Sequence, residues 1–521
     1  MPAQVAKPLN NLLAGLAGEP AGPTASTTVT GISTDSRLVS PGDLFVALPG
    51  EHAHGQRYAA AAAAAGAVAM VAPPETPWPS GLPGLRHPAP EEILAELAAR
   101  LYDRPAERMR VFGVTGTNGK TTTALLTGWL LRAGGRRVAH WTTTEVDDGG
   151  APFRPVWTTP PAHRLHRFLH DALQAGCDHA VIEVSSHAVV QRRTAGITFA
   201  AGIATNVSPD HLDFHKTFAA YVAAKRAFIT GLPASAIAVL NADDPIVSGF
   251  GAATAARPIR FGFSPNAGLR ALDVHSDAGG TRFTVGVAED VRRADGCLLA
   301  RGGPLRIPLL LPLIGRHNVS NALAAIGATL WAGVSPEAIA VALPAFPTPP
   351  RRLEPQTVGP YTVMNDVAMN EASYETVLRT VADLAYPQVV VVHAVRGQRG
   401  PEINARIGRA LAAWNSRLVF QPLIVSLSRS RLRRYPVNYE VTDAELAAFT
   451  AAAGDMTLDV QAELEDAIAA ALNRLQPGGL LLLLGTFGMD DGPALAVERL
   501  RAKAGAGDAA PRRYMDQRER D

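Results

Sequence analysis

Short runs of apolar residues alternate with longer amphipathic stretches along most of this chain. The clearest case is Arg110–Thr115, an apolar run of strand length, which leads into a glycine-rich turn and then into a stretch of helical periodicity at 121–133. Strand-like runs recur at 180–184, 200–205 and 236–240. Because strands and helices follow one another in this order, we expect an α/β domain with a largely parallel sheet.

The same alternation continues on both sides of this block. Near the start, 59–72 predicts a buried helix that runs into a strand, and 91–102 predicts a second helix. Beyond residue 350, further buried strands are predicted between helices such as 463–475, at 388–393, 423–426 and 479–485. We therefore expect another α/β domain towards the C-terminus.

Two segments dense in proline and glycine, 72–90 and 344–350, separate these blocks. The last residues are rich in alanine, arginine and aspartate, a composition typical of a disordered tail. The sequence therefore predicts three domains and a tail, with the bounds 1–105, 106–345, 346–504 and 505–521.

Composition narrows the class of protein. The 521 residues carry 49 Lys and Arg against 47 Asp and Glu, so the formal charge of +2 gives no general hold on a polyanion, and we expect no nucleic-acid partner. The first ten residues lack the basic and apolar regions of a secretory signal, and no apolar stretch is long enough to span a bilayer. The chain has only Cys177 and Cys297, which favours the reducing cytoplasm. We expect a cytoplasmic, monomeric protein without membrane insertion.

The strongest chemical signal is the segment Gly-Val-Thr-Gly-Thr-Asn-Gly-Lys-Thr-Thr at 113–122. Glycines after a strand let backbone N–H groups converge on phosphate oxygens, and the following helix adds the positive end of its dipole. In such a loop Lys120 reaches the β- and γ-phosphates, and Thr121 ligates Mg²⁺. The common G-x-x-x-x-G-K-[ST] spacing is not met, because Val114 stands five residues before Gly119. The alternative is a glycine-rich turn with a lysine there by chance.

This variant loop resembles that of the Mur ligases, the ATP-dependent amide-forming enzymes of peptidoglycan precursor synthesis. Further motifs follow in the family's order over about residues 30 to 330, and the opening block is similar to the MurE type, which makes UDP-N-acetylmuramoyl tripeptide. The motifs include Thr34-Asp35-Ser36-Arg37, Pro41-Gly42-Asp43, Thr158-Thr159-Pro160, Glu183-Val-Ser-Ser-His187, Asp210-His211, Tyr221-Val-Ala-Ala-Lys225 and Asn318-Val-Ser-Asn321.

The resemblance implies an α/β fold with the three-domain Mur ligase architecture. Its domains would be a binder of the UDP-MurNAc peptide, a central P-loop ATPase with a parallel sheet, and a Rossmann-like C-terminal domain that binds the amino acid. It implies ATP and Mg²⁺ as cofactors, and UDP-MurNAc-dipeptide and a free amino acid as partners. In such a reaction ATP phosphorylates a carboxylate, an amine attacks the acyl phosphate, and cations offset the charge of the moving phosphoryl group.

The resemblance also implies roles for single residues. Catalytic residues would be Lys120, Glu183, His211 and Lys225, the last as a carbamylated lysine. Metal ligands would be Thr121, Glu183, His211 and Lys225. ATP would be bound by Gly116, Thr117, Asn118, Gly119, Lys120, Thr121, Thr122, Asn318, Arg352 and Asp366, and the UDP-muramoyl substrate by Ser36, Thr158, Thr159, Ser185, Gln191 and Arg193. Taken singly, Glu183 is more typical of a solvated carboxylate than of a ligand, His211 of a loop histidine and Lys225 of a surface charge.

The C-terminal block departs from the family pattern. Arg352-Leu-Glu is similar to the family's Arg-Met-Glu, with Arg351 at a usual glycine, but Asp-Tyr-Ala-His-Thr-Pro is replaced by Asp-Val-Ala-Met-Asn-Glu at 366–371. The diaminopimelate motif Asp-Asn-Pro-Arg is missing near 426–432, and Gly-Lys-Gly-His-Glu is replaced at 485–490. Arginines at 396, 399 and 429–434 indicate either recognition of an anion or a solvated basic edge.

These departures leave three hypotheses. The first is an ATP-dependent ligase that adds an amino acid, such as the diamino acids L-lysine or L-ornithine, to UDP-N-acetylmuramoyl-L-alanyl-D-glutamate through an acyl phosphate. The second is a divergent Mur-like ligase acting on another carboxylate. The third is a pseudo-ligase that binds nucleotide and precursor without joining an amine.

Overall fold

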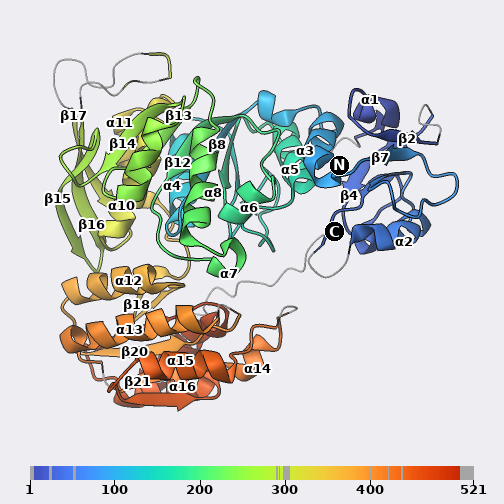
Figure 1. Ribbon diagram of the computed structural model, residues 1–521. Coiled ribbons are helices and arrows are strands. Elements are labelled where there is room, and N and C mark those ends of the chain that lie inside the picture. Colours follow the sequence, from blue (N-terminus) through green and yellow to red (C-terminus); the bar gives the residue numbers. More distant parts are fainter. Residues whose placement is uncertain are drawn as a thin grey trace.

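The computed structural model describes residues 5–22, 26–50, 54–288, 292, 294–296, 305–398, 400–420, 422–435 and 438–504. The predicted tail, 505–521, and Cys297 lie outside these residues. Three domains follow one another along the chain, as predicted (Figure 1). The central domain lies between the other two, with the N-terminal domain at one side and the C-terminal domain beneath it in this view.

The N-terminal domain is built on a five-stranded sheet of order β2-β7-β6-β5-β4. Strands β4 to β7 are parallel, and β2 is antiparallel to β7. The proline-rich segment 72–90 is more than a boundary, because it contains β7. The elements are β1 Lys7–Pro8, α1 Leu9–Leu13, β2 Glu19–Ala21, β3 Thr28–Val29, β4 Gly31–Ser33, η1 Ser36–Leu38, β5 Asp43–Val46, η2 Gly55–Tyr58, α2 Ala59–Ala64, β6 Ala69–Ala72, β7 Gly84–Arg86, α3 Pro90–Leu101 and η3 Pro105–Glu107.

The central domain holds a ten-stranded sheet of order β10-β9-β11-β8-β12-β13-β14-β15-β16-β17. It is parallel from β9 to β15, whereas β10, β16 and β17 run antiparallel to their neighbours. The elements are β8 Arg110–Thr115, α4 Lys120–Ala133, β9 Val138–Trp141, β10 Val146–Asp147, α5 Ala162–Gln174, β11 His179–Glu183, α6 Ser186–Val190, β12 Phe199–Ala204, α7 Leu212–His215, α8 Phe218–Thr230, β13 Ile237–Asn241, α9 Pro245–Ser248, η4 Gly249–Ala252, β14 Arg257–Gly262, β15 Leu269–Asp277, β16 Gly280–Val287, β17 Leu305–Leu311, α10 Arg316–Trp331, α11 Pro336–Ala342 and η5 Leu343–Ala345.

Side chains of β8 point alternately to the two faces of this sheet, and helices cover both faces. Phe112 and Val114 point into one hydrophobic core, which they share with Leu126 of α4 and Leu323 of α10. Val111 points to the opposite face and into a second core. Because side chains alternate across a strand, helices on both faces bury the apolar run completely, and its carboxyl end is left to the glycine-rich loop.

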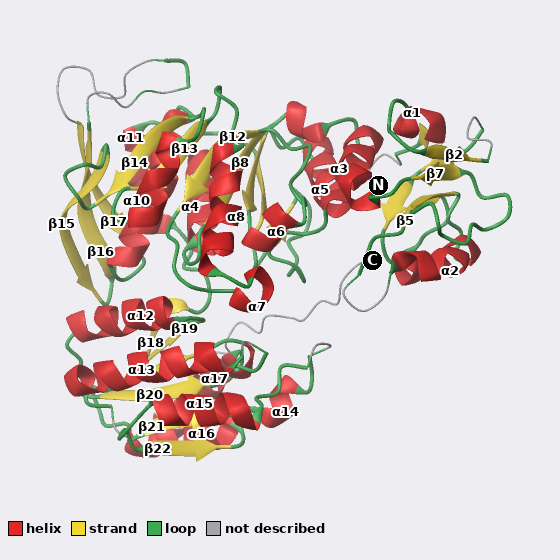
Figure 2. Ribbon diagram, in the orientation of Figure 1, coloured by secondary structure: helices red, strands yellow, loops and turns green. Residues whose placement is uncertain are grey.

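The C-terminal domain has a six-stranded sheet of order β18-β19-β23-β20-β21-β22, parallel from β19 onwards with β18 antiparallel at the edge. Helices again cover both faces (Figure 2). The elements are β18 Arg352–Val358, β19 Tyr361–Asp366, α12 Glu371–Asp383, β20 Val389–Ala394, α13 Pro401–Leu418, β21 Leu423–Ser426, α14 Arg429–Leu432, α15 Asp443–Ala452, β22 Leu458–Gln461, α16 Leu464–Arg474, β23 Leu480–Leu484, η6 Phe487–Met489 and α17 Gly492–Ala504.

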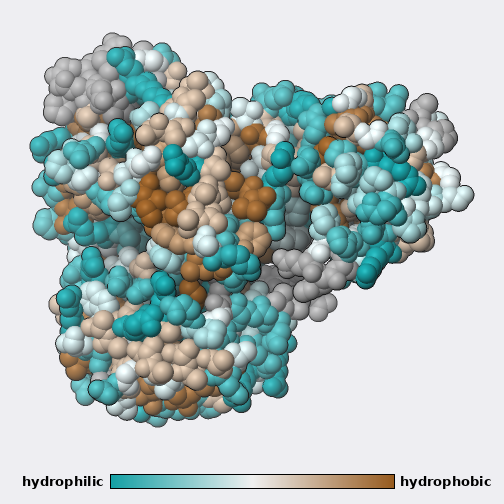
Figure 3. All heavy atoms as spheres, viewed as in Figure 1, coloured by the Kyte–Doolittle hydropathy of each residue, from teal (hydrophilic) through white to brown (hydrophobic). Residues whose placement is uncertain are grey.

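In the space-filling view, polar side chains cover much of the visible face, and hydrophobic groups gather over the central domain (Figure 3). Among the described residues, none of the helices has the length and apolar character required to cross a bilayer. The α/β class and the parallel sheets with covering helices agree with the prediction. The strands β15 to β17, which extend the central sheet with antiparallel pairs, were not predicted.

Candidate functional site

The glycine-rich loop connects the buried strand β8 to helix α4. Gly116 and Gly119 have φ angles of 151° and 85°. A Cβ atom would lie 1.9 Å from Thr205 Oγ1 at Gly116, and 2.3 Å from Asn321 Oδ1 at Gly119. Both positions therefore require glycine, for backbone conformation and for space. The side chain of Lys120 folds back over the loop, where its Nζ donates to Gly116 O at 3.0 Å and Thr117 O at 2.9 Å.

Residues at the end of the neighbouring strand β12 form hydrogen bonds with this loop. Thr205 Oγ1 and Asn206 Nδ2, which follow β12, both donate to Asn118 O, at 2.7 and 3.0 Å. Asn206 Oδ1 accepts from Asn118 N at 2.9 Å. Asn318, on the first turn of α10, is buried, and its Oδ1 accepts from Asn321 Nδ2 at 3.3 Å. The loop is thus held rigidly, with the N-terminus of α4 behind it, as phosphate binding requires.

Lys225 lies beneath the same loop. Its Nζ donates to Gly116 O at 2.6 Å and stands 4.7 Å from the centre of the Tyr221 ring, one turn earlier on α8. Burial, together with the nearby Lys120 ammonium, lowers the pKa of Lys225 well below its ordinary value, and Asp210 opposes this effect. Lys225 is only 2% exposed, so the interpretation as a surface charge is wrong.

His211 stands close to this lysine. It adopts a φ angle of 53° just before α7. Its ring lies 4.7 Å from that of His187 and 6.3 Å from that of Tyr221, between ring centres. Tyr221 therefore lies next to both His211 and Lys225, and its hydroxyl is 3.0 Å from Thr117 Oγ1. One tyrosine thus links two predicted catalytic residues to the glycine-rich loop.

Glu183 ends strand β11, directly beside Val114 of β8. Its side chain is 0% exposed, so it is not a solvated carboxylate. Its two carboxylate oxygens accept from Thr143 N at 2.7 Å and from Thr143 Oγ1 at 3.2 Å. Both donors are neutral, and a buried carboxylate is stable when a cation offsets its charge.

The donors near the loop fit a divalent cation that phosphate oxygens help to hold. Within the described part of the chain, no three His, Cys, Asp or Glu side chains are grouped so as to hold a metal by themselves. Mg²⁺ in nucleotide sites keeps several water and phosphate ligands, and needs only one or two from the protein. The buried hydroxyl of Thr121 and the carboxylate of Glu183 match that requirement.

The predicted residues for the UDP-muramoyl substrate form a second group, next to Glu183. Thr159 Oγ1 donates to the backbone O of Glu183 at 2.7 Å and lies 3.3 Å from Ser185 Oγ. Arg193 Nη1 donates to Thr159 O at 2.6 Å, and Arg193 Nη2 to Gln191 Oε1 at 2.5 Å. Thr158 Oγ1 accepts from Thr143 Oγ1, at 3.1 Å. Burial lowers the pKa of Arg193.

Ser36 begins the turn η1 of the N-terminal domain. The neighbouring Asp35 side chain accepts from Arg37, and this bond together with the Arg37 and Arg164 charges lowers the pKa of Asp35, against a raising effect of burial. Arg164 belongs to α5 of the central domain, and its guanidinium lies 5.0 Å from the centre of the Trp157 ring. The turn at Ser36 therefore faces the segment that carries Thr158.

In the C-terminal domain, Arg352 and Asp366 pair across β18 and β19. Burial raises the pKa of Asp366 to about 6, although Arg352 and Arg351 oppose this. Arg352 also lies near His317 on the first turn of α10, because its charge and, more strongly, burial lower the pKa of His317 to about 4. Arg352 and Asp366 therefore stand at the edge of the domain that faces the central domain.

A second polar cluster lies at the carboxyl ends of the C-terminal strands. The Asp490 carboxylate accepts from Arg351 and, at 2.6 Å, from the Tyr435 hydroxyl, and Arg154 of the central domain stands 3.8 Å away. Arg351 has a φ angle of 59°, a conformation that glycine adopts more easily than other residues. The ring of Phe487 packs against Tyr435, with 5.2 Å between ring centres.

Sequence reasoning missed several of these residues. Tyr221 stands in a motif named above but was given no role of its own, although its spacing of four from Lys225 on a predicted helix places both on one face. Thr143, Asn370 and Asp490 carry no local signal, since their partners are distant in the sequence.

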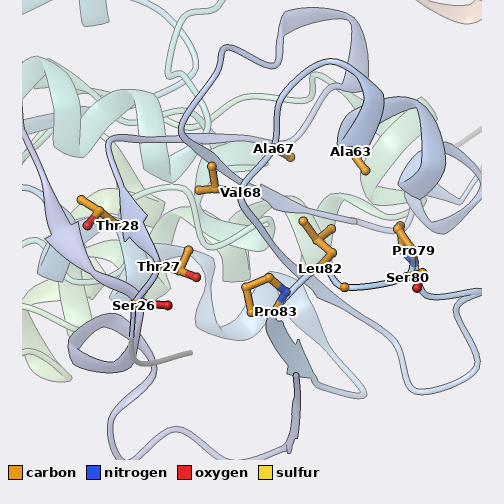
Figure 4. Close-up of a pocket in the computed structure, with 11 residues that line it drawn as sticks. Ser26, Thr27, Thr28, Ala63, Ala67, Val68, Pro79, Ser80, Leu82 and Pro83 are labelled. Atoms are coloured by element: carbon orange, nitrogen blue, oxygen red, sulfur yellow. The ribbon is translucent and has the colours of Figure 1, made fainter. Parts of the chain in front are cut away.

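A hollow of about 550 Å³ in the N-terminal domain lies apart from these groups (Figure 4). Serine, threonine, alanine, valine, leucine, proline and glycine line it, at Ser26, Thr27, Thr28, Ala63, Ala67, Val68, Pro79, Ser80, Gly81, Leu82 and Pro83. It presents no charged side chain, so it offers no grip on a phosphate.

Comparison with protein families accounts for all three domains. Three family descriptions match in order: "Mur ligase family, catalytic domain" at 28–102, "Mur ligase middle domain" at 114–329 and "Mur ligase, glutamate ligase domain" at 351–487. A UDP-N-acetylmuramyl-tripeptide synthetase of Roseiflexus sp. (strain RS-1) is 35% identical over 493 residues, 89% of this chain and 90% of that protein. The chain belongs to the Mur ligase family. The predicted family, fold class and enzyme class, an ATP-dependent ligase, are confirmed.

Other relatives of this Mur ligase are named after one amino acid. A UDP-N-acetylmuramoyl-L-alanyl-D-glutamate--2,6-diaminopimelate ligase of Streptomyces avermitilis is 33% identical over 492 residues, 91% of each chain. A solved structure of a ligase with that name has a TM-score of 0.64 at 21% identity, covering 96% of this chain and all of that one. MurF from Thermotoga maritima in complex with ADP has a TM-score of 0.65 at 18% identity, covering 91% of this chain and 98% of its own. At these identities the structures show a shared fold.

Proposed function

We propose that this Mur ligase joins an amino acid to UDP-N-acetylmuramoyl-L-alanyl-D-glutamate, with ATP, in peptidoglycan precursor synthesis in the cytoplasm. The observation that carries the proposal is the arrangement around Glu183. Its strand ends beside Val114, just before the nucleotide loop, and its backbone oxygen accepts from Thr159, one of the residues expected to hold the UDP-muramoyl substrate. A substrate carboxylate held there would lie beside the γ-phosphate of ATP, as phosphoryl transfer needs. We propose 1–105, 106–345 and 346–504 as the three domains.

In this proposal the chain's own residues divide the work of the first step. The loop 116–122 binds the phosphates through its N–H groups, and Lys120 moves from Gly116 O to the phosphate oxygens. Thr159, Ser185 and Arg193 orient the UDP-muramoyl peptide. Thr121 and Glu183 would hold Mg²⁺, and His211 and a carbamylated Lys225 a second ion. When bound, these ions offset phosphate charge.

Carbamylation of Lys225 is chemically favoured by its surroundings. A lysine reacts with carbon dioxide as the neutral amine, and burial beside Lys120 favours that form. The product is an anion, so the unfavourable contact between two cations would become a favourable one. This supports a role for Lys225 as a metal ligand.

We further propose that the added residue is a diamino acid such as L-lysine or L-ornithine. The support is Asp490, a carboxylate of the C-terminal domain that lies 3.8 Å from Arg154 of the central domain. Ligands of open α/β sheets bind at the carboxyl ends of the strands, where Asp490 lies. A side-chain ammonium could pair with Asp490, and the amino acid's carboxylate with the guanidinium of Arg351. The second candidate is 2,6-diaminopimelate, which the names of several relatives favour.

Incubation with ATP, UDP-MurNAc-L-Ala-D-Glu and single amino acids, followed by mass spectrometry, tests the proposal. We expect a mass gain equal to lysine or ornithine less water, with ADP release. If only diaminopimelate gives a product, the proposed ligase activity stands, but the proposed amino acid is wrong. No gain with any amino acid, despite tight binding of both substrates, would indicate the pseudo-ligase. Failure to bind the UDP precursor would favour a ligase for another carboxylate.

Asp490→Asn tests the acceptor contact directly. We expect a KM for the diamino acid at least about tenfold higher, because a charge-assisted bond is lost. The KM for ATP should stay within about twofold. Glu498→Gln on the outer part of α17 is the control for removal of a carboxylate from this domain. An unchanged KM for the amine in Asp490→Asn would exclude Asp490 from acceptor binding.

A further inference from the structure

Asn370 links the C-terminal domain to the nucleotide loop. It is the residue before helix α12, which lies where the C-terminal and central domains meet (Figures 1 and 2). Its side chain is 2% exposed. Within its own domain it caps the helix, since Asn370 Oδ1 accepts from Ser373 N at 3.1 Å, and Ser373 Oγ accepts in turn from Asn370 N at 3.0 Å.

The same amide also crosses to the central domain. Asn118 of the nucleotide loop donates from Nδ2 to Asn370 Oδ1 at 3.1 Å. Asn370 Nδ2 donates to Asp210 Oδ2 at 3.1 Å, with Asn118 Oδ1 at 3.4 Å. Asp210 is 3% exposed and directly precedes His211. One side chain of the C-terminal domain therefore contacts both the loop expected to bind ATP and the turn that carries a predicted metal ligand.

These contacts depend on docking of the domain. Asn118 and Asp210 are each more than 150 residues from Asn370 in the sequence and belong to the central domain. Separation of the two domains would therefore break the two bonds to Asn118 and the bond to Asp210 at once. The bond to the Asp210 carboxylate is charge-assisted and buried, which makes it stronger than a bond between neutral groups. Asp210 lies near Lys225 as well, because its charge acts to raise the pKa of that lysine.

We propose that Asn370 is a positioning residue, which aligns the nucleotide loop and the Asp210–His211 turn when the C-terminal domain docks. This inference rests on the proposed ATP-dependent ligation. The domain that presents the amine thereby completes the ATP site, so phosphoryl transfer is favoured when the acceptor domain is in place. Helix capping alone would require only the bond to Ser373.

Asn370→Thr separates the two roles. Threonine also caps a helix, but its side chain is too short to span both Asn118 and Asp210. We expect a kcat about 10- to 100-fold lower and a dissociation constant for ATP at least about fivefold higher, with a thermal midpoint that falls less than in Asn370→Ala because the helix cap is kept. Binding of UDP-MurNAc-dipeptide should stay within about twofold of wild type, because the side chain of Asn370 bonds Asn118, Asp210 and Ser373 rather than the residues predicted to hold that substrate.

Thr442→Ala is the matched control. Thr442 forms the capping box of α15 in the same domain, and its side chain bonds Glu445 of its own helix rather than the central domain. We expect it to lower the thermal midpoint and to leave kcat and ATP affinity unchanged. Asn370→Ala should lower the thermal midpoint, kcat and the affinity for ATP. A cycle of Asn118→Ala and Asn370→Ala should show losses that do not add, because the two side chains share one contact.

The inference is overturned if Asn370→Thr binds ATP and turns over like wild type, or if Asn370→Ala matches Thr442→Ala in every measurement. ATP affinity is read by calorimetry and needs no turnover. A wild-type protein that joins no amine would therefore refute the proposed function, while the effect of Asn370→Thr on ATP binding would still decide the positioning role.

Discussion

Replacement of Lys225 by methionine removes a buried amine while keeping most of its length. In the wild-type protein the Lys120 and Lys225 nitrogens bind the same oxygen, Gly116 O, at 3.0 and 2.6 Å. They therefore lie within about 6 Å of each other, where two unit charges repel by about 3 kcal/mol at an effective dielectric constant of about 20. Two ammonium groups in this place are unfavourable, and Lys225, the more buried, is the one expected to be neutral or carbamylated.

From this geometry, Lys225→Met should fold at least as stably as the wild-type protein. A neutral or repelled amine contributes little, Gly116 O keeps its bond from Lys120, and an apolar side chain suits the buried position. Catalysis should respond in the opposite way. If Lys225 carries a carboxylate that offsets charge during phosphoryl transfer, its loss should lower kcat by about 10²- to 10³-fold.

The assay is ADP release with saturating substrates, alongside thermal unfolding. Arg226→Met, the next residue on α8 and exposed, is the control for loss of a cation. A protein equilibrated with ¹³C-bicarbonate should give a carbamate resonance that Lys225→Met lacks. A variant with a kcat within about twofold of wild type would refute the reasoning. If Lys225→Met is inactive but the wild-type protein gives no carbamate resonance, Lys225 acts as an amine and not as a carbamate.

Three further changes test other parts of the site. Gly119→Ala should raise the KM for ATP at least about tenfold in initial-rate assays. A Cβ atom there would lie 2.3 Å from Asn321 Oδ1, and the left-handed conformation costs alanine about 1–2 kcal/mol. An unchanged KM would disprove tight packing of the loop. Arg193→Met should raise the KM for the UDP precursor and leave that for ATP alone, and the reverse pattern would place Arg193 on the nucleotide side. The pKa of Asp366 is about 6 in the folded protein and 3.8 in the unfolded chain, so the unfolded chain releases this proton first as the pH rises. The free energy of unfolding should therefore fall by up to about 3 kcal/mol as the pH rises from 4 to 6. The thermal midpoint of Asp366→Asn should therefore gain on wild type over that interval, and a constant difference would contradict the raised pKa.

The sequence predicts best where local pattern and burial act together. Leu423–Ser426 and Arg110–Thr115 were predicted as strands and are strands with those bounds. Both are short runs with helices on both faces of the sheet, and apart from the exposed Arg110 at the start of its strand, every residue in them is apolar or small. The glycine-rich loop was identified for a related reason, since Gly116 and Gly119 have conformations that other residues rarely adopt.

The strands that were missed have a different pattern. In β15, Leu269–Asp277, buried and exposed positions mostly alternate, and polar residues occupy the exposed face. This sheet extension has one solvated side, so its strands do not form continuous apolar runs. A search for alternation, in addition to apolar runs, would have detected β15 to β17.

Contacts between domains are beyond such patterns, because they depend on how whole domains dock. Asn370 and Asp490 each stand at a point where the C-terminal block departs from the family motifs, and these departures are the reason for considering a pseudo-ligase. In the structure each is instead a buried or half-buried side chain with partners in the central domain. Loss of the familiar motif is therefore no evidence that polar contacts were lost with it.

The two departures bear on different steps. Asn370 contacts the nucleotide loop, and Asp490 lies beside Arg154 of the central domain, where we expect the amine. A pseudo-ligase would have no need for docking contacts that align the ATP site with the acceptor domain, since it transfers no acyl group to an amine. Buried, charge-assisted bonds such as that of Asn370 to Asp210 lose much of their value when one partner is removed, which leaves the other unsatisfied. The presence of both contacts therefore favours a ligase with an altered acceptor over an inactive relative.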